Sequence, residues 1–521
     1  MSRLSFLRTS LHPFLFAAFP PLFLYARNLE TVSRGELIPP LLLEAALTLG
    51  VWAVLYRIRS ARRALPILFS LFWIGFFLYG PCERNILLIL EKNPGLARPL
   101  LFFLWWTAYG LMVFFLIRSK RDLGSLNAAF TAAGAVLVGL QLLRLLGGWI
   151  AAPASPSPDH IHRFPAPARI GHPGYRPSIF FLVADAYGRA DALQTGYGFD
   201  AGPTLREWEA MGFKVLPRAR ANYSQTVPSL ASCLNGEYIQ RLLPGPVCSR
   251  AGVTHLLKYN ALFPALRSLG YRIAVIPSGY GPTEIPSDEQ IPVPVVQLTE
   301  FQSTLCNYTP LPWITTFIPV FDQYDLHRKR LNRTFDSLKD LARRPGPWFV
   351  FVHILFPHAP FVYDAKGRSV DPPYAFSLND DPQSMGFPGH SVEEFRAAYI
   401  AGYRAQLPAA NLRLTQTLKG ILHNAPEPPV IFLLADHGPS GRYDPRSLEN
   451  TFLDERFGIL WAYYAPPRFP LHYPDDSTPV NLFRRLLSDG FGFPTPPLEN
   501  REYFSTWESP CELEEVTDRL P

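Results

Sequence analysis

Residues 178–191 read SIFFLVADAYGRAD, an apolar run that ends at an aspartate. Four later runs have the same character: YRIAVIP (271–277), WFVFVHIL (348–355), PVIFLLAD (429–436) and FGILWAYYAP (457–466). Nearly continuous Ile, Val, Leu and Phe over such lengths indicates strands that are buried on both faces, as in a mostly parallel sheet covered by helices. We therefore predict an α/β domain whose chemistry lies beyond the carboxyl ends of its strands.

The first third of the chain is too apolar for a soluble domain. The whole sequence is 48% hydrophobic, and these residues gather before about residue 152. Apolar runs lie near 11–26, 37–58, 64–81, 97–117 and 126–150. Each approaches the roughly 20 residues that a membrane-spanning helix needs, although two prolines interrupt the first. We expect a transmembrane domain of about five helices over residues 1–152.

The positions of the basic residues predict how these helices are oriented in the membrane. One loop contains Arg57, Arg59, Arg62 and Arg63, and another contains Arg118, Lys120 and Arg121. Because cytoplasmic loops collect Lys and Arg, both loops and the N-terminus are predicted to be inside. The chain is then a multi-pass protein of the cell (inner or plasma) membrane. Its α/β domain is periplasmic or extracellular.

The formal charge of +6 does not indicate a nucleic-acid partner. Residues 1–150 contain 15 Lys and Arg against 6 Asp and Glu, whereas the remainder contains 34 against 37. The basic excess therefore belongs to membrane topology and not to a binding face. Within the apolar runs, Glu44 and Arg144 are expected to pair, with a lipid-headgroup contact as the alternative.

The two domains are joined by a segment rich in Pro and Ala. Residues 153–177 have no apolar period and are predicted to form an extended linker. The catalytic domain is then expected over residues 178–521. If its compartment is oxidising, Cys233 and Cys248 are candidate disulfide partners.

Two predicted strands end in possible metal ligands. Asp185 follows the first, and Asp436 with His437 follows the fourth. Carboxylate and imidazole ligands that meet at one sheet edge suit zinc or a hard divalent cation. Taken singly, each Asp is as well explained as a helix cap, and each His as a structural residue. Their conjunction predicts a metal site.

Thr226 lies in NYSQTVPSLASCLNG (222–236), between these strands. Pro228 suits the first turn of a helix, so Thr226 is expected at the helix N-terminus, where backbone N–H groups favour an anion. A Thr hydroxyl becomes a nucleophile only when a metal or a base activates it. The alternative is that Thr226 merely caps the helix.

These motifs together resemble the alkaline-phosphatase-like (sulfatase-like) superfamily. Thr226 to Gly236 is similar to the sulfatase signature Cys/Ser-x-Pro-Ser-Arg-x-x-x-Leu-x-Gly. VADAYGRAD and ADHG resemble the metal-binding strand ends of that superfamily, and HILFPHAPF (353–361) resembles its HxxxPHxPF segment. The match covers about residues 178–466. It implies an α/β fold of the sulfatase-like type.

Departures from the sulfatase pattern indicate the subclass. Leu230 replaces the sulfatase Arg, and Thr226 cannot become formylglycine. A Thr nucleophile on a chain with N-terminal membrane helices resembles the phosphoethanolamine and phosphoglycerol transferases and the lipoteichoic acid synthases. The usual Glu of those enzymes is here Asp185.

The resemblance implies a metalloenzyme that moves a phosphoryl-linked headgroup from a membrane lipid to a surface glycan or lipid through a covalent Thr intermediate. Asp185, Thr226, Asp436 and His437 would hold zinc or manganese, with magnesium also compatible. His358 would act in catalysis. Substrate contacts would come from His353, Asn222 and Arg189. The alternatives are a phosphodiesterase, phosphomonoesterase or sulfuric-ester hydrolase of the same superfamily, and a non-catalytic membrane scaffold.

The predicted topology can be tested with reporter fusions. A reporter that is active only outside the cytoplasm should be active when fused after residue 160 and inactive when fused near Ala61. A cytoplasmic reporter should give the opposite result. If both patterns are reversed, the predicted number of spans is wrong.

Overall fold

The computed structural model describes most of the chain, and two compact units are found in it. The described residues are 11–29, 32, 34–58, 62–90, 94–119, 121–151, 163–165, 175–243, 248–292, 298–315, 322–372, 376–378 and 391–520. Most of the predicted linker 153–177 lies outside them. One unit contains the described residues up to Ala151 together with the segment Leu298–Asp322, and the other contains most of the rest.

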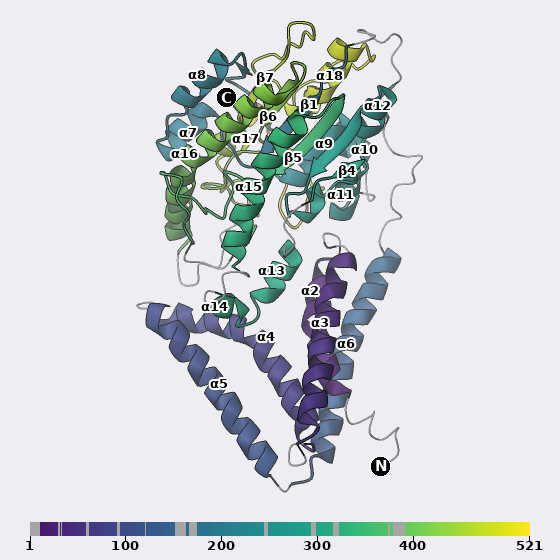
Figure 1. Ribbon diagram of the computed structural model, residues 1–521, viewed down its shortest axis with the longest axis vertical. Helices are drawn as coiled ribbons and strands as arrows, with labels where there is room; N and C mark the ends of the chain where they lie inside the picture. The colour runs from purple at the N-terminus through teal and green to yellow at the C-terminus, as the bar shows by residue number, and fades with distance from the viewer. Residues whose placement is uncertain are drawn as a thin grey trace. The chain divides into compact units, whose positions relative to one another are not determined.

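The first unit is a set of long apolar helices (Figure 1). They are α2 (His12–Arg27), α3 (Arg34–Leu55), α4 (Leu65–Leu90), α5 (Pro94–Arg118) and α6 (Gly124–Ala151). Four of them, α3 to α6, contain stretches long and apolar enough to cross a membrane. Helix α2 has 16 residues, about 24 Å of helix, against a hydrocarbon core of about 30 Å. A fifth span therefore remains a prediction.

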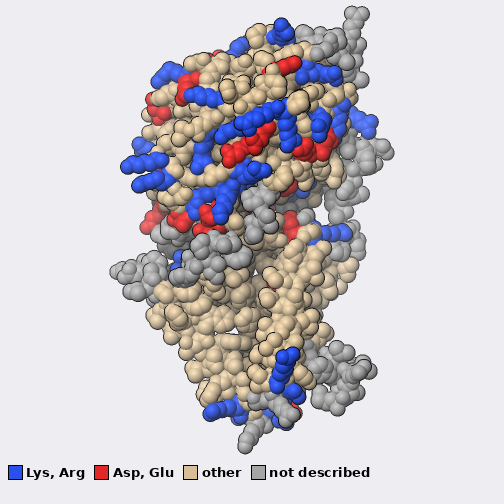
Figure 2. Space-filling view, viewed as in Figure 1, with Lys and Arg blue, Asp and Glu red and all other residues tan. Residues whose placement is uncertain are grey.

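The surface of the helical unit agrees with its composition. On the face drawn in Figure 2 it is almost free of charged side chains, apart from Lys and Arg gathered at one end. Large apolar side chains such as Leu104, Phe115 and Leu143 are more than half exposed. Exposed apolar area of this extent is stable in lipid and unstable in water.

The expected pair of Glu44 and Arg144 is wrong. Glu44 is 6% exposed, and its Oε2 has no hydrogen-bond partner among the described residues. Arg144 lies exposed on α6. The physical reason is that Glu44 lies on the packed face of α3, one turn before buried Thr48, which accepts a hydrogen bond from Trp73 of α4, whereas Arg144 lies on an exposed face of α6.

A segment from the second half of the chain belongs to the helical unit. It contains α13 (Glu300–Cys306) and α14 (Leu311–Thr315). The ring of Phe301 meets that of Tyr25 edge-on at 6.3 Å, and Gly80 donates a backbone hydrogen bond of 3.0 Å to Tyr308. A Cβ on Gly80 would lie 2.1 Å from a carbonyl oxygen of this segment. Only glycine permits that approach.

The second unit is built on a seven-stranded sheet in the order β2-β7-β6-β1-β5-β3-β4. Its strands are β1 (Ile179–Ala184), β2 (Lys214–Val215), β3 (Arg272–Ile276), β4 (Glu289–Gln290), β5 (Trp348–Ile354), β6 (Val430–Leu434) and β7 (Trp461–Tyr464). Strands β6, β1, β5, β3 and β4 are parallel, whereas β7 pairs antiparallel with β6 and with β2. The predicted fold class, apolar helices followed by an α/β domain with a mostly parallel sheet, is confirmed.

Helices and short strands complete this unit. They are α7 (Ala190–Tyr197), α8 (Gly202–Ala210), α9 (Thr226–Asn235), α10 (Ile239–Leu242), α11 (Arg250–Lys258), α12 (Leu262–Ser268), α15 (Gln323–Ala342), α16 (Val392–Asn424), α17 (Leu453–Phe457) and α18 (Leu482–Phe491), with a separate hairpin of β8 (Tyr503–Phe504) and β9 (Glu514–Glu515). Helices α15 and α16 pack against each other. A Ser391 capping box starts α16, and left-handed Gly236 ends α9.

One disulfide joins distant parts of the second unit. It links Cys248 to Cys511, so the expected partner of Cys248 was wrong. Cys233 is a buried free thiol within α9, where it packs as a small apolar side chain.

Phe483 of α18 packs against the centre of the sheet. Its ring meets Phe181 of β1 at 5.0 Å, Phe349 of β5 at 5.8 Å and Phe432 of β6 at 6.2 Å. All four side chains are buried. This cluster holds the three strands that carry the site residues described below.

Phe483→Ala should destabilise the α/β unit by about 3–5 kcal/mol, because it opens a cavity against three strands. The measurement is urea unfolding followed by circular dichroism in detergent. As a control, Leu412→Ala on α16 removes a side chain that is 57% exposed and should change stability by at most about 0.5 kcal/mol. Equal effects of the two substitutions would contradict the prediction.

Candidate active site

The three central strands bring acids and imidazoles to one edge of the sheet. Asp185 follows β1, His353 lies near the end of β5, and Asp436 with His437 follows β6. Strands β5 and β6 are the two parallel neighbours of β1. Because parallel strands end at the same edge, four residues far apart in sequence become neighbours.

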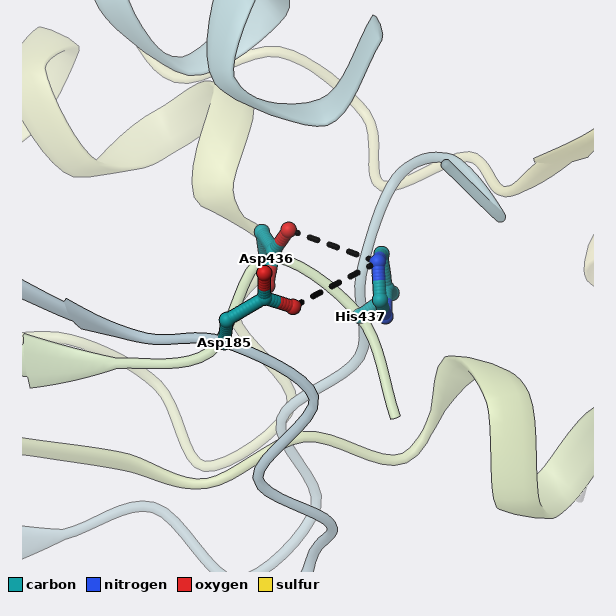
Figure 3. Close-up of side chains that lie close together, drawn as sticks. All are labelled: Asp185, Asp436 and His437. Carbon is teal, nitrogen blue, oxygen red and sulfur yellow. Dashed lines mark ion pairs between the residues drawn. The ribbon is translucent and has the colours of Figure 1, made fainter. Parts of the chain in front are cut away.

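Asp185, Asp436 and His437 point toward one another (Figure 3). His437 Nε2 lies 3.8 Å from Asp185 Oδ1 and 3.4 Å from Asp436 Oδ2. His353 Nε2 lies 3.1 Å from Asp185 Oδ2, without the alignment of a hydrogen bond. All four side chains are almost completely buried.

The donor set fits a divalent cation. One ligand atom from each of Asp185, Asp436 and His437 lies within 4.8 Å of the others. Asp185 Oδ1 and Asp436 Oδ2 are buried without hydrogen-bond partners within the described residues. Two buried carboxylates with unpartnered oxygens cost several kcal/mol unless a positive charge faces them. A cation between them would satisfy both.

Neighbouring groups affect the protonation of these ligands. Burial alone would raise the pKa of Asp185, but the neighbouring imidazoles of His358, His353 and His437, when protonated, lower it below its usual value. His437 Nδ1 donates to the carbonyl of Gly438 at 2.9 Å. In the neutral ring this leaves Nε2 as the unprotonated nitrogen that faces the carboxylates.

The backbone around the acids is tightly constrained. Ala186 has φ of 60°, a conformation that non-glycine residues rarely adopt. Its N–H lies 3.3 Å from Asp436 Oδ1, to which it donates. A Cβ on Gly438 would lie 1.8 Å from the carbonyl oxygen of Glu455. Strain and close approach of this kind are typical of functional sites.

Thr226 reaches the same point from another element. It is the first residue of α9, and its Oγ1 lies 3.0 Å from His437 Nε2. The N-cap of α9 is Gln225, so Thr226 is not the cap. Ser229, one turn later, donates to the carbonyl of Asp436 at 2.7 Å. That bond fixes the start of α9 against the end of β6.

Thr226 and His437 line a cavity together with Asp185, His358, Tyr280 and Arg456. His358 Nδ1 donates to the carbonyl of Ala359 at 2.5 Å. Arg456 is 3% exposed and donates to the carbonyls of Ser224, at 2.7 Å, and Gly438, at 3.0 Å. A fixed cation and an imidazole therefore share the cavity with the Thr226 hydroxyl, as an anionic substrate would require.

Three other predicted site residues are not among those that line the cavity. His353 is buried behind the carboxylates, 3.2 Å from Thr283 through Nδ1, and is not among the residues that line the cavity. Asn222 donates to the carbonyl of Arg501 and accepts from Val480 N–H. Arg189 is held by Asp191 at 2.7 Å and by the carbonyl of Ala219. Neither Asn222 nor Arg189 is among the residues that line the cavity, so a substrate contact for either stays a prediction.

Several cavity residues were not predicted from the sequence. They are Gln225, Arg250, Tyr280, Arg446, Arg456 and Trp507. Except for Gln225, beside Thr226, they lie outside the motifs. Arginine and tryptophan are common on surfaces and in cores, so no local pattern distinguishes them.

Comparisons with known proteins found several solved structures with a similar fold. No protein-family model and no curated protein matches the sequence. The zinc complex of the C-terminal periplasmic domain of EcEptC from Escherichia coli is similar at 13% identity, with 69% of this chain and 98% of that chain covered and a TM-score of 0.43. The integral membrane lipooligosaccharide phosphoethanolamine transferase EptA from Neisseria meningitidis is similar at 13% identity, with 94% and 95% covered and a TM-score of 0.39. The phosphonate monoester hydrolase of Agrobacterium radiobacter is similar at 16% identity, with 63% and 80% covered and a TM-score of 0.41.

Removal of a ligand should abolish metal binding. Asp436→Asn and His437→Ala should each lose metal, measured by elemental analysis, because the remaining groups cannot complete the shell. Added zinc should raise the melting temperature of the wild-type protein but not of either variant, since only a bound ligand stabilises the folded state.

The matched control is Asp336→Asn, an exposed carboxylate on α15 that pairs with Lys339. It should bind metal as the wild type does. Full metal content in the Asp436 and His437 variants would show that these residues are not ligands.

Proposed function

We propose that this chain is a membrane-anchored metalloenzyme of the alkaline-phosphatase-like superfamily that transfers a phosphoryl-linked headgroup from a membrane lipid to a surface glycan or lipid. One observation carries the proposal: the Thr226 hydroxyl, at the start of a helix, lies 3.0 Å from His437 Nε2, the nitrogen beside the buried carboxylates of Asp185 and Asp436, in a cavity that His358 and Arg456 also line. The headgroup is of the phosphoethanolamine or phosphoglycerol type.

A bound divalent metal, held by Asp185, Asp436, His437 and Thr226, would supply charge that lowers the pKa of the Thr226 hydroxyl. Thr226, its proton released to solvent, bonds through Oγ to the phosphorus of the lipid donor while the bond to the lipid alcohol breaks; the second step restores Oγ as the alkoxide. His358 protonates the departing oxygen. The product of this first step is a phosphodiester on Thr226.

The second step regenerates the enzyme. An acceptor hydroxyl gives its proton to His358 and bonds to the phosphorus, while the bond to Thr226 Oγ breaks. The N–H groups at the start of α9 and the guanidinium of Arg456 stabilise the negative charge on the phosphoryl oxygens in both steps. Water in place of the acceptor would give hydrolysis, so product analysis with and without an acceptor separates the two activities.

The setting of the site supports a cell-surface reaction. The same chain has four helices long and apolar enough to span a membrane, which would hold the enzyme in the bilayer that contains its donor. The Cys248–Cys511 disulfide suits an oxidising compartment outside the cytoplasm. We propose a periplasmic or extracellular position for the α/β unit.

The nucleophile can be tested with three substitutions. Thr226→Ser keeps a hydroxyl and should retain some turnover of a lipid or chromogenic phosphodiester. Thr226→Ala and Thr226→Asn lack a hydroxyl and should lose turnover by several orders of magnitude. Intact mass after incubation with membrane lipids should show an adduct on the wild-type protein and none on the Ala and Asn variants.

Melting temperatures serve as the control in this experiment. Each substitution should cost at most about 2 kcal/mol, because Gln225 and not Thr226 is the helix cap. A well-folded Ala or Asn variant with normal turnover would remove Thr226 from the mechanism.

A further inference from the structure

The C-terminal segment returns to the loop that precedes Thr226. Tyr503 N–H donates to the carbonyl of Asn222 at 2.8 Å, and Ser224 N–H donates to the carbonyl of Tyr503 at 3.3 Å. The side-chain amide of Gln225 donates to the carbonyls of Ser505 and Thr506, both at 3.0 Å. The end of the chain is therefore bonded to the residue next to the proposed nucleophile.

A covalent bond holds the next residues of this segment. The Cys248–Cys511 disulfide spans 263 positions in sequence and ties the segment to the start of α11. The guanidinium of Arg250, the first residue of α11, lies 4.1 Å from the centre of the Trp507 ring and donates to the Trp507 carbonyl. The disulfide thus holds together the two segments that contain Arg250 and Trp507, whose guanidinium and indole are in contact.

This contact lies in the wall of the proposed active site. Arg250, Trp507, Arg446 and Glu508 line the same cavity as Thr226. The side chain of Arg446 lies 3.4 Å from that of Glu508. The backbone N–H of Trp507 donates to the carbonyl of Pro445 at 2.7 Å. Trp507 as a residue is 42% exposed, so part of its surface is open to a ligand.

A buried atom in the same wall has no partner. Gln225 is 4% exposed and lines the cavity. Its amide nitrogen is held by the C-terminal segment, but its Oε1 has no hydrogen-bond partner among the described residues. Buried acceptors in proteins are almost always paired. A donor from a bound substrate would satisfy this one.

We propose that residues 503–511, locked by the Cys248–Cys511 disulfide, form a specificity wall that binds the part of the substrate outside the transferred phosphoryl group, with Arg250, Trp507 and Gln225 as its contact residues. This inference rests on the proposed function. The chemistry of the wall selects a hydroxylated group with a nearby negative charge. Trp507 offers a flat aromatic face to a sugar or glycerol unit. Arg250 offers a positive charge to the negative group, and Gln225 Oε1 offers an acceptor to a hydroxyl group.

Steady-state turnover tests the wall. Trp507→Ala and the double variant Cys248→Ser/Cys511→Ser should reduce kcat/KM at least tenfold, mainly through KM, with vesicles of phosphatidylethanolamine and phosphatidylglycerol. Turnover of methyl 4-nitrophenyl phosphate, which has no hydroxylated group to bind the wall, should fall by a clearly smaller factor. Tyr259→Ala is the matched control, because this aromatic residue follows α11 and is 50% exposed; it should behave as the wild type.

The two half-reactions identify the group that the wall binds. A variant that slows formation of the Thr226 adduct from lipid alone assigns the wall to the donor. A variant that forms the adduct normally but slows its decay with acceptor glycan assigns the wall to the acceptor. Unchanged rates in both halves, or an equal loss with both substrates at an unchanged melting temperature, would overturn the proposal.

A binding measurement keeps the two proposals distinguishable. Thr226→Ala protein with added zinc should bind glycerophosphoethanolamine and glycerophosphoglycerol at least tenfold more tightly than the same protein with Trp507→Ala, or after reduction of its disulfide. This difference does not require turnover. Inactivity of the wild-type protein with both substrates would refute the proposed function. Equal binding of these donor fragments by the paired proteins, together with unchanged decay of the adduct with acceptor glycan, would refute the wall even if the enzyme is active.

Discussion

The repulsion between two buried carboxylates is the constraint on which the site depends. Asp185 and Asp436 each present an oxygen without a partner, at the ends of adjacent strands in the centre of the sheet. Folding these charges into the interior is costly unless a cation or imidazolium compensates them. His353 and His437 surround the pair within about 4 Å, and a divalent metal would complete the compensation.

Other elements are arranged around this charge cluster. Helix α9 brings Thr226 to His437, and Ser229 fixes that helix to the backbone of Asp436. Arg456 joins the loop before Thr226 to the loop after His437 through the carbonyls of Ser224 and Gly438. These bonds hold the Thr226 hydroxyl, a guanidinium and an imidazole in fixed positions, so little reorganisation would accompany the proposed reaction.

The division of the chain into two units serves the proposed reaction in different ways. The helical unit offers apolar faces to lipid, and it includes α13, whose Phe301 and Leu305 are buried in its core. The α/β unit contains the candidate active site and one disulfide. A lipid donor would come from the bilayer that holds the first unit, and the disulfide would be stable only where the second unit is exposed to an oxidising compartment.

The sequence by itself determined the membrane helices, the buried strands and the acids that follow them. These features depend on local composition and period, which the run SIFFLVAD already displays. The tertiary structure alone decided that β7 is antiparallel, that Glu44 and Arg144 are not paired, and that Cys248 binds Cys511. It also brought Arg250, Arg456 and Trp507 to Thr226. Those outcomes depend on contacts between residues that are not neighbours in sequence, up to 263 positions apart for the disulfide. Local sequence holds no signal for them because packing of the whole chain selects each partner.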